Sequence, residues 1–216
     1  VRSSAASDVY KRQVREARGE YLLFLNNDVE IITENWLEEM LQLCQQKDVG
    51  MVGAKLYYPD DTIQHAGVVV GLGGVAAHVL CKLPRDAEGY MGRLRCVQEI
   101  SAVTAACMMV KTSVFKAVGG FDEELKVAFN DIDLCMKVRK YGVKIVFTPY
   151  AELYHYESKS RGMEDTPEKQ LRFSREVNCF RRKWERELLK GDPYYNPNLT
   201  LNNTDCSLRK QEKNGD

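Results

Sequence analysis

YLLFLNND, at residues 21–28, is the stretch that decides the fold prediction, because five apolar residues run directly into Asn26, Asn27 and Asp28. A short apolar run that ends in polar residues is typical of a central strand buried on both faces. Ligand sites of α/β sheets lie beyond the carboxyl ends of such strands. One carboxylate at this position can bind a hard divalent cation. A simple polar turn is the alternative, and this motif alone does not exclude it.

Strand and helix patterns alternate along the rest of the chain. Strands are predicted over residues 49–57, 102–110 and 143–147 (closed by Pro149), with a glycine-rich strand and loop over 66–77. Helices are predicted over 33–44, capped by Thr33, and from Thr112 or Ser113 to Gly119. A third helix is predicted over 130–141, with Tyr141 inward. A fourth is predicted from Thr166 to about Leu189, with Phe173 and Trp184 in its buried stripe. The alternation indicates an α/β fold, although it does not predict the order of the strands.

Composition excludes several classes of protein. The 216 residues suit one domain at ~150 residues per domain. Lys+Arg and Asp+Glu both count 31, which argues against a nucleic-acid partner. No apolar run approaches the ~18 residues of a membrane-spanning helix. The seven cysteines form no CxxC pair, which indicates buried thiols and a reducing cytoplasm instead of a disulfide framework.

The sequence Asn130-Asp131-Ile132-Asp133 opens a predicted helix. Its two carboxylates are two residues apart and therefore point to different sides of the helix. Acidic residues at a helix N-terminus cap the helix and complement its dipole. Alternatively, one of them faces a cleft and removes a proton from a substrate. The pattern leaves both interpretations open.

The chain holds three histidines, His65, His78 and His155, each at a separate place. They form neither HxxxH nor HExxH, so a preformed zinc site is not expected. The chain also lacks the GxGxxG, GxSxG and GxxxxGK[ST] motifs of dinucleotide-binding proteins, α/β-hydrolases and P-loop NTPases.

Five stretches together resemble the catalytic domain of family 2 glycosyltransferases of GT-A type, especially the rhamnosyltransferase-like members of O-antigen and capsule pathways. They are GEYLLFLNNDVEI (19–31), TIQHAGVVVGLGG (62–74), AVTAACMMVKTSVFKAVGGFDE (102–123), FNDIDLCMKVRKYG (129–142) and YHYESKSRG (154–162). Their number and order carry the resemblance, which covers nearly everything from residue 14 onward. The resemblance implies a mixed sheet flanked by helices. It also implies a cytoplasmic enzyme, which would work at the inner face of the membrane when its acceptor is bound there.

The resemblance also implies roles for individual residues. Asn26-Asn27-Asp28 falls on the D-x-D motif of the family, so Asp28 would hold Mg²⁺ or Mn²⁺ against the diphosphate of the donor, with Asn26 and Asn27 beside it. Asn130-Asp131 falls on the E-D pair, so Asp131 would be the general base. His155 falls on a histidine that completes the metal or diphosphate site.

Further residues are assigned by the same resemblance. Arg161 would reach the donor phosphates, whereas Asp133, His65 and His78 would lie on the acceptor side; helix capping is the alternative for Asp133. Tyr156 stands where many relatives have a second histidine. The absence of Q-x-x-R-W favours a single transfer over polymerisation.

The expected organisation has three parts. Residues 1–13 are expected to be a non-native or disordered leader, residues 14–191 the C-terminal portion of the catalytic domain, and residues 192–216 an extended tail. The strand-helix-strand half that binds the nucleotide in this family is expected to be missing. The function expected is inverting, metal-dependent transfer of a hexose or rhamnose from a nucleotide-diphosphate sugar to a glycan or lipid-linked acceptor. A non-catalytic carbohydrate- or partner-binding fragment is the alternative.

Overall fold

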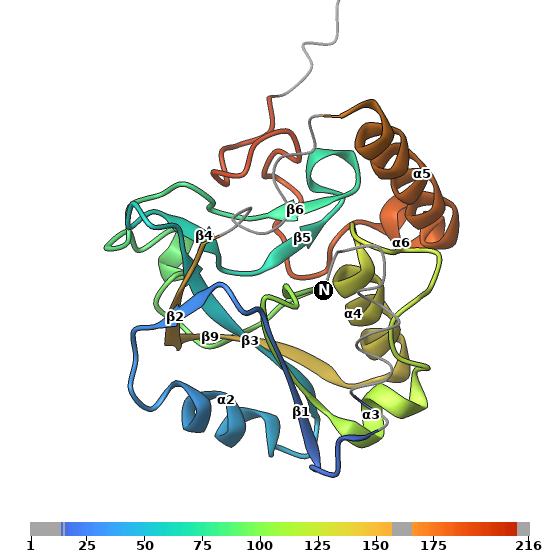
Figure 1. Ribbon diagram of the computed structural model, residues 1–216. Helices are drawn as coiled ribbons and strands as arrows, with labels where there is room; N and C mark the ends of the chain where they lie inside the picture. Colours follow the sequence, from blue (N-terminus) through green and yellow to red (C-terminus); the bar gives the residue numbers. More distant parts are fainter. Residues whose placement is uncertain (1–13, 15, 157–165, 211–216) are drawn as a thin grey trace, which may run out of the picture.

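The computed structural model describes residue 14 and residues 16–156 and 166–210, and a seven-stranded mixed sheet forms its centre (Figure 1). The strands are β1 (Tyr21–Leu25), β2 (Val29–Ile31), β3 (Val49–Tyr57), β4 (Ile63–His65), β7 (Gln98–Glu99), β8 (Cys107–Lys111) and β9 (Lys144–His155). Their order is β1-β8-β3-β9-β2, with β4 paired to β3 and β7 to β9. The pair β3–β9 is parallel, whereas β1–β8, β3–β8, β3–β4, β2–β9 and β7–β9 are antiparallel. The α/β prediction is confirmed.

Strand β3 is the centre of the core, since all nine of its residues are buried. Gly53 allows a close approach there, because a Cβ at this residue would lie 2.3 Å from Cγ1 of Val103. Strand β1 differs from the prediction of burial on both faces. Its Leu22 and Phe24 are buried, whereas Leu23 and Leu25 are 36% and 38% exposed.

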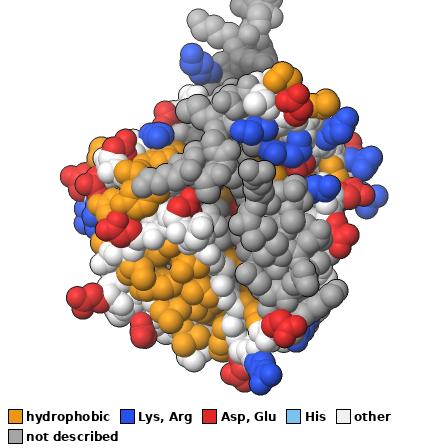
Figure 2. Space-filling view, in the orientation of Figure 1, with side chains coloured by type: hydrophobic (Ala, Val, Ile, Leu, Met, Phe, Trp, Pro, Cys, Tyr) orange, Lys and Arg blue, Asp and Glu red, His pale blue; other side chains and the backbone are white. Residues whose placement is uncertain are grey.

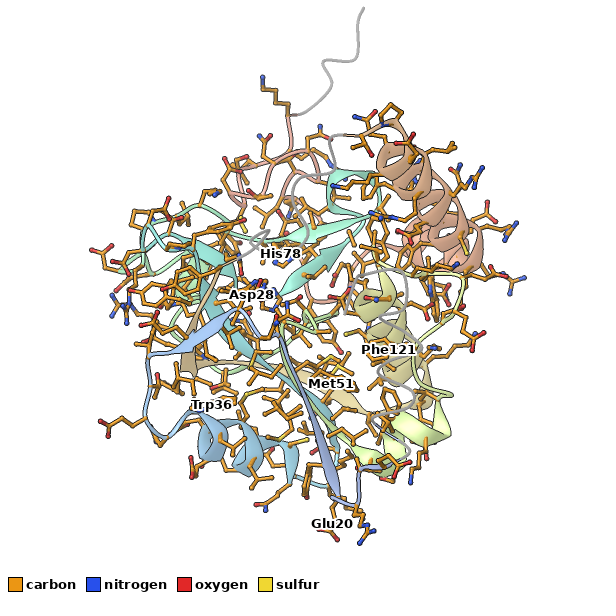
Figure 3. All side chains as sticks on the ribbon, viewed as in Figure 1. Glu20, Asp28, Trp36, Met51, His78 and Phe121 are labelled. Atoms are coloured by element: carbon orange, nitrogen blue, oxygen red, sulfur yellow. The ribbon has the colours of Figure 1, made fainter. Side chains whose placement is uncertain are left out.

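Helices cover both faces of the sheet (Figure 1). On one face, α2 (Trp36–Cys44) packs Trp36 and Met40 into an apolar cluster with residues of β3 and β9. On the other face lie α3 (Thr112–Ala117) and α4 (Asn130–Tyr141), whose core includes Phe121. Figure 3 shows Trp36 and Phe121 on these two sides. The helices α5 (Pro167–Lys183) and α6 (Glu185–Lys190) pack next to α4 through Phe180 and Trp184.

A small hairpin lies at one edge of the sheet. It joins β5 (Val68–Val70) to β6 (Ala76–His78) through a 3₁₀ turn, η2 (Leu72–Gly74), and a second 3₁₀ turn, η3 (Tyr90–Gly92), follows. Tail residues contact this hairpin: Asp192 accepts from the backbone of Val70 at 2.8 Å, and the carbonyl of Leu201 accepts from the backbone of Gly73 at 2.8 Å. Residues 192–210 are thus part of the folded unit.

Several predicted boundaries are wrong for local reasons. Strand β9 continues through Pro149. It pairs with β3 up to Phe147 and again from Glu152, so Pro149 lies in the segment between them that does not pair with β3. The predicted cap Thr33 instead accepts from the backbone of Glu152 at 3.2 Å, and α2 starts after Asn35. The last long helix breaks at Trp184, which lies between α5 and α6.

Two predicted inward residues are exposed: Tyr141 at 57% and Phe173 at 42%. The predicted strand over 102–110 is also shorter, since β8 begins only at Cys107. Across the described ranges, no helix combines the length and apolarity needed to cross a bilayer.

Candidate active site

The candidate site lies where β1, β4 and β9 end. Asn26 and Asp28 directly follow β1, and His155 is the last residue of β9. Pairing of β2 with β9 sets Val29 opposite His155, and the backbone of Tyr156 donates to the carbonyl of Asp28 at 2.8 Å. Figure 3 shows Asp28 at the upper edge of the sheet, in the same region of the view as His78. The strand-end position predicted for Asp28 is therefore found.

His155 is the centre of this group. Its Nε2 lies 3.3 Å from Oδ1 of Asp28 and 3.0 Å from Nδ2 of Asn26. Its Nδ1 lies 2.7 Å from Oε1 of Gln64, whose Nε2 donates to the carbonyl of His155 at 3.2 Å. Because the amide nitrogen is engaged in this way, Oε1 faces the ring, and Nδ1 must carry the proton that it donates. In the neutral ring, Nε2 then presents its lone pair to Asn26 and Asp28.

Asp131 lies in the first turn of α4, close to the same edge of the sheet. Its Oδ2 accepts from the backbone of Ala105 at 3.1 Å, and its Oδ1 accepts from the backbone of Ile132 at 2.9 Å. The next residue, Ala106, accepts at its carbonyl from the backbone of Asn26 at 3.0 Å. Residues 105–106 thus join the start of α4 to the end of β1, and Asp28 and Asp131 belong to one region.

His65 and His78 form a second pair beside this group. Their Nδ1 atoms are 3.0 Å apart, and their ring centroids are 4.9 Å apart. Burial holds the pKa of His65 well below its usual value, and the neighbouring His78 and His155 lower this pKa further. His65 is therefore neutral. Its buried Nε2 has no hydrogen-bond partner within the described residues.

Asp133 does not fit the acceptor-side role, because its side chain is fully buried. Its Oδ1 accepts from Nε1 of Trp184 at 2.8 Å and lies 2.7 Å from Nζ of Lys183, while its Oδ2 lies 3.2 Å from Nζ of Lys137. The carboxylate therefore ties α4 to the junction between α5 and α6. Of the two carboxylates in the first turn of α4, Asp131 remains the candidate for chemistry.

The remaining predicted site residues are Asn27 and Arg161. Asn27 is exposed. Arg161 lies outside the described residues. The described part of the chain holds no cluster of three His, Cys, Asp or Glu side chains that could bind a metal ion alone. Gln64 lies in the stretch 62–74 but was assigned no role, because its partner His155 is 91 residues away along the chain.

Comparisons with known proteins identify the family of this chain. A sequence model described as "Glycosyltransferase like family" matches residues 2–176. The chain belongs to this glycosyltransferase family. It is 40% identical over 203 residues to the O-antigen biosynthesis protein RfbC of Myxococcus xanthus, covering 94% of this chain and 16% of that protein. It is 56% identical over 196 residues to protein y4gI of Sinorhizobium fredii, covering 90% of this chain and 22% of that protein. The chain thus spans about a fifth of the length of these relatives.

A solved structure of GalNAc-T7 with UDP, GalNAc and Mn²⁺ superimposes on this glycosyltransferase domain with a TM-score of 0.60 at 13% identity, covering 87% of this chain and 36% of that one. This likeness shows the fold, which is of the GT-A type expected. The resemblance stated from the sequence is therefore confirmed for both family and fold.

Proposed function

We propose that this domain transfers a sugar from a nucleotide-diphosphate-sugar donor to a hydroxyl of a glycan or lipid-linked acceptor, with inversion and with the help of Mg²⁺ or Mn²⁺. One observation carries the proposal: Asp28 and His155 are in contact at one end of the sheet, and residues 105–106 link that end to Asp131. Membership of the glycosyltransferase family supports transfer of a sugar, and the O-antigen relative supports a glycan acceptor.

The donor atoms of Asp28 and His155 suit a divalent cation. A carboxylate oxygen and a neutral imidazole nitrogen that lie 3.3 Å apart present two lone pairs to each other. In the structure the Nδ2 group of Asn26, 3.0 Å from Nε2, donates to the imidazole lone pair; a cation between Nε2 and Oδ1 of Asp28 would replace that donor, and oxygen and imidazole ligands suit Mn²⁺. Gln64 supports the ligand role of His155, since histidines that bind metals usually donate their other N–H to a fixed acceptor. A bound Mg²⁺ or Mn²⁺ would neutralise the charge that grows on the leaving diphosphate.

Asp131 is proposed as the general base. It takes the proton of the acceptor hydroxyl while that oxygen bonds to the anomeric carbon. The bond from that carbon to the phosphate oxygen breaks on the opposite face, and its electron pair leaves with the diphosphate. A base must lie within ~2.6–3.2 Å of the proton donor in the complex. The backbone N–H groups of Ala105 and Ile132 fix the orientation of the carboxylate for this task.

The surrounding residues have supporting roles in this proposal. Asn26, Asn27 and Arg161 would contact the donor, and His65 and His78 the acceptor. A cytoplasmic enzyme with a lipid-linked acceptor would work at a membrane surface. The Lys and Arg side chains over α5 in Figure 2, three of them in its last turn, support contact with anionic headgroups, because basic surfaces attract such lipids.

Binding and turnover test the two carboxylates separately. Mn²⁺ binding is followed by the loss of the free-ion electron paramagnetic resonance signal, with and without UDP, GDP or dTDP. We expect Asp28→Asn to lose Mn²⁺ binding, and Asp131→Asn to retain it while sugar transfer falls by about 10²–10⁴-fold. The exposed and remote Asp48→Asn is the matched control. Unchanged Mn²⁺ binding in Asp28→Asn would reject the metal site, and retained turnover in Asp131→Asn would reject the base.

The same measurements separate the proposal from a non-catalytic module. A module that only binds carbohydrate or a partner protein would consume no nucleotide sugar in any variant. Its carboxylates would affect stability alone.

A further inference from the structure

A cavity separate from the candidate active site opens on the side of β3 and β9 that faces residues 84–95. It is a cavity of about 1050 Å³, with Lys55, Arg85, Tyr150 and Glu152 in its wall. This size suits a small-molecule or oligosaccharide site, since such pockets hold ~300–1,000 Å³. None of the residues that line it is a candidate metal ligand or the proposed base.

An irregularity in the sheet lies beside this cavity, whose wall includes Pro149 and Tyr150. Gly53 pairs with Phe147 and Lys55 pairs with Glu152, so β3 advances by two residues where β9 advances by five. The extra residues of β9 leave the ladder, and Tyr150 among them is 54% exposed. Bulges of this kind are common next to functional sites, where they re-aim side chains.

The cavity wall holds a buried lysine, Lys55. Lys55 is only 5% exposed, and its Nζ donates to the carbonyl of Leu94 at 3.1 Å and lies 5.3 Å from the ring centroid of Tyr57. Burial lowers its pKa, although the neighbouring Glu152 opposes this shift. A buried ammonium group is costly unless polar partners satisfy it, and a single carbonyl uses one of its three N–H donors.

A network of charged groups surrounds this lysine. The guanidinium of Arg85 lies 3.3 Å from Glu152 and 3.5 Å from Asp61, and its carbon is 4.9 Å from the ring centroid of Tyr57. The Tyr57 hydroxyl donates to Glu152. These contacts hold donors and acceptors in fixed positions along one wall.

The mixture of charges indicates the class of ligand. Three cationic and four anionic side chains line the cavity. A phosphate-rich ligand would meet the carboxylates, and an apolar ligand would leave charged groups unpaired. A sugar satisfies both kinds of group, because each hydroxyl donates and accepts. The exposed ring of Tyr150 adds an apolar surface on which one face of a sugar ring can pack.

We propose that this cavity binds neutral sugar units of the acceptor glycan that lie beyond the reacting hydroxyl. Two segments lead from it to the candidate site: β9 runs from Glu152 to His155, and Thr62 directly precedes β4, which carries Gln64. At ~3.3 Å per residue these steps span about 7–10 Å, which is the scale of a short oligosaccharide. The inference rests on the proposed function in one respect, namely that the acceptor is a glycan.

Saturation-transfer NMR on the 216-residue chain tests this inference, with maltotriose, cellotriose, chitotriose and a rhamnose trisaccharide as probes at millimolar concentration. We expect at least one trisaccharide to bind, without need for Mn²⁺ and without competition from UDP. Its affinity should fall about tenfold in Lys55→Met and in Tyr150→Ala, since each variant removes one contact of a bound sugar. The exposed and remote Asp48→Asn should bind it as the unchanged chain does.

Tyr150→Ala is expected to fold normally, because the ring is largely exposed on the surface. Circular dichroism checks the fold of each variant. Binding by none of the four probes would overturn the inference. Binding that neither cavity variant weakens would overturn it as well. Trisaccharide binding without nucleotide or Mn²⁺ binding would leave this site standing and remove the proposed transferase, so the two failures are distinguishable.

Discussion

Glu176 on α5 is the residue whose replacement tests how the start of α4 is held. It is 3% exposed, and it accepts three backbone N–H groups: Lys126 and Val127 at 3.0 Å to Oε1, and Ala128 at 2.9 Å to Oε2. These amides directly precede the first turn of α4, which carries Asp131. The carboxylate therefore holds the backbone that sets the position of the proposed base.

Glu176→Gln should lower the free energy of unfolding by about 2–4 kcal/mol. The variant keeps one acceptor oxygen, so at least one buried N–H meets an NH₂ group, and each hydrogen bond to a charged group contributes about 1.5–3 kcal/mol. Urea unfolding with an unchanged m-value measures this loss. The exposed Glu185→Gln removes the same charge and should change stability by less than about 0.5 kcal/mol.

Hydrogen exchange provides a local readout of the same contact. The amides of Lys126, Val127 and Ala128 should exchange faster in Glu176→Gln, because they lose their acceptor, whereas amides of β3 should follow only the global change. Equal stability of the two glutamine variants, together with unchanged exchange at these three amides, would refute the reasoning.

Three further predictions concern the core. The pKa of His65 lies well below its usual 6.5, so the unfolded chain binds more protons than the folded chain below about pH 6.5. The free energy of unfolding should therefore fall as the pH drops from about 7 to 5, by at most about 1.4 kcal/mol per pH unit. His65→Gln should flatten this pH dependence when the free energy of unfolding is measured with urea. Gly53→Ala should cost about 1–3 kcal/mol in thermal unfolding, because its Cβ would clash with Val103; an unchanged melting temperature would contradict this contact. Asp133→Asn should cost about 2–4 kcal/mol in urea, since it leaves Lys183 and Lys137 without their shared carboxylate, and a loss below about 0.5 kcal/mol would show that the ion pairs contribute little.

The sequence was sufficient for those features that depend on local pattern. The apolar run 21–25 predicted the strand β1 that ends just before the polar residues Asn26 to Asp28, and the spacing in 130–141 predicted α4. Turn residues also worked, since Gly142 ends α4 with a φ of 96°. These signals lie within a few residues of one another along the chain.

Features that depend on distant partners could not be predicted in this way. Spacing on α4 predicted that Asp131 and Asp133 point to different sides, but only packing against Trp184 shows which one is buried. The passage of β9 through Pro149 depends on the register of β3, and the exposure of Leu23 depends on which strands flank β1. The role of Gln64 requires His155, which is 91 residues away along the chain.

Strand β9 has one more consequence for specificity. Under the proposed binding of the acceptor, the separation between Glu152 at the cavity and His155 at the candidate site would set the distance between the anchored sugar unit and the reacting hydroxyl. An acceptor glycan whose reacting hydroxyl lies at a different distance from its anchored sugar unit cannot occupy both sites at once. Changing the number of residues between Glu152 and His155 should therefore reset the preferred length of the acceptor.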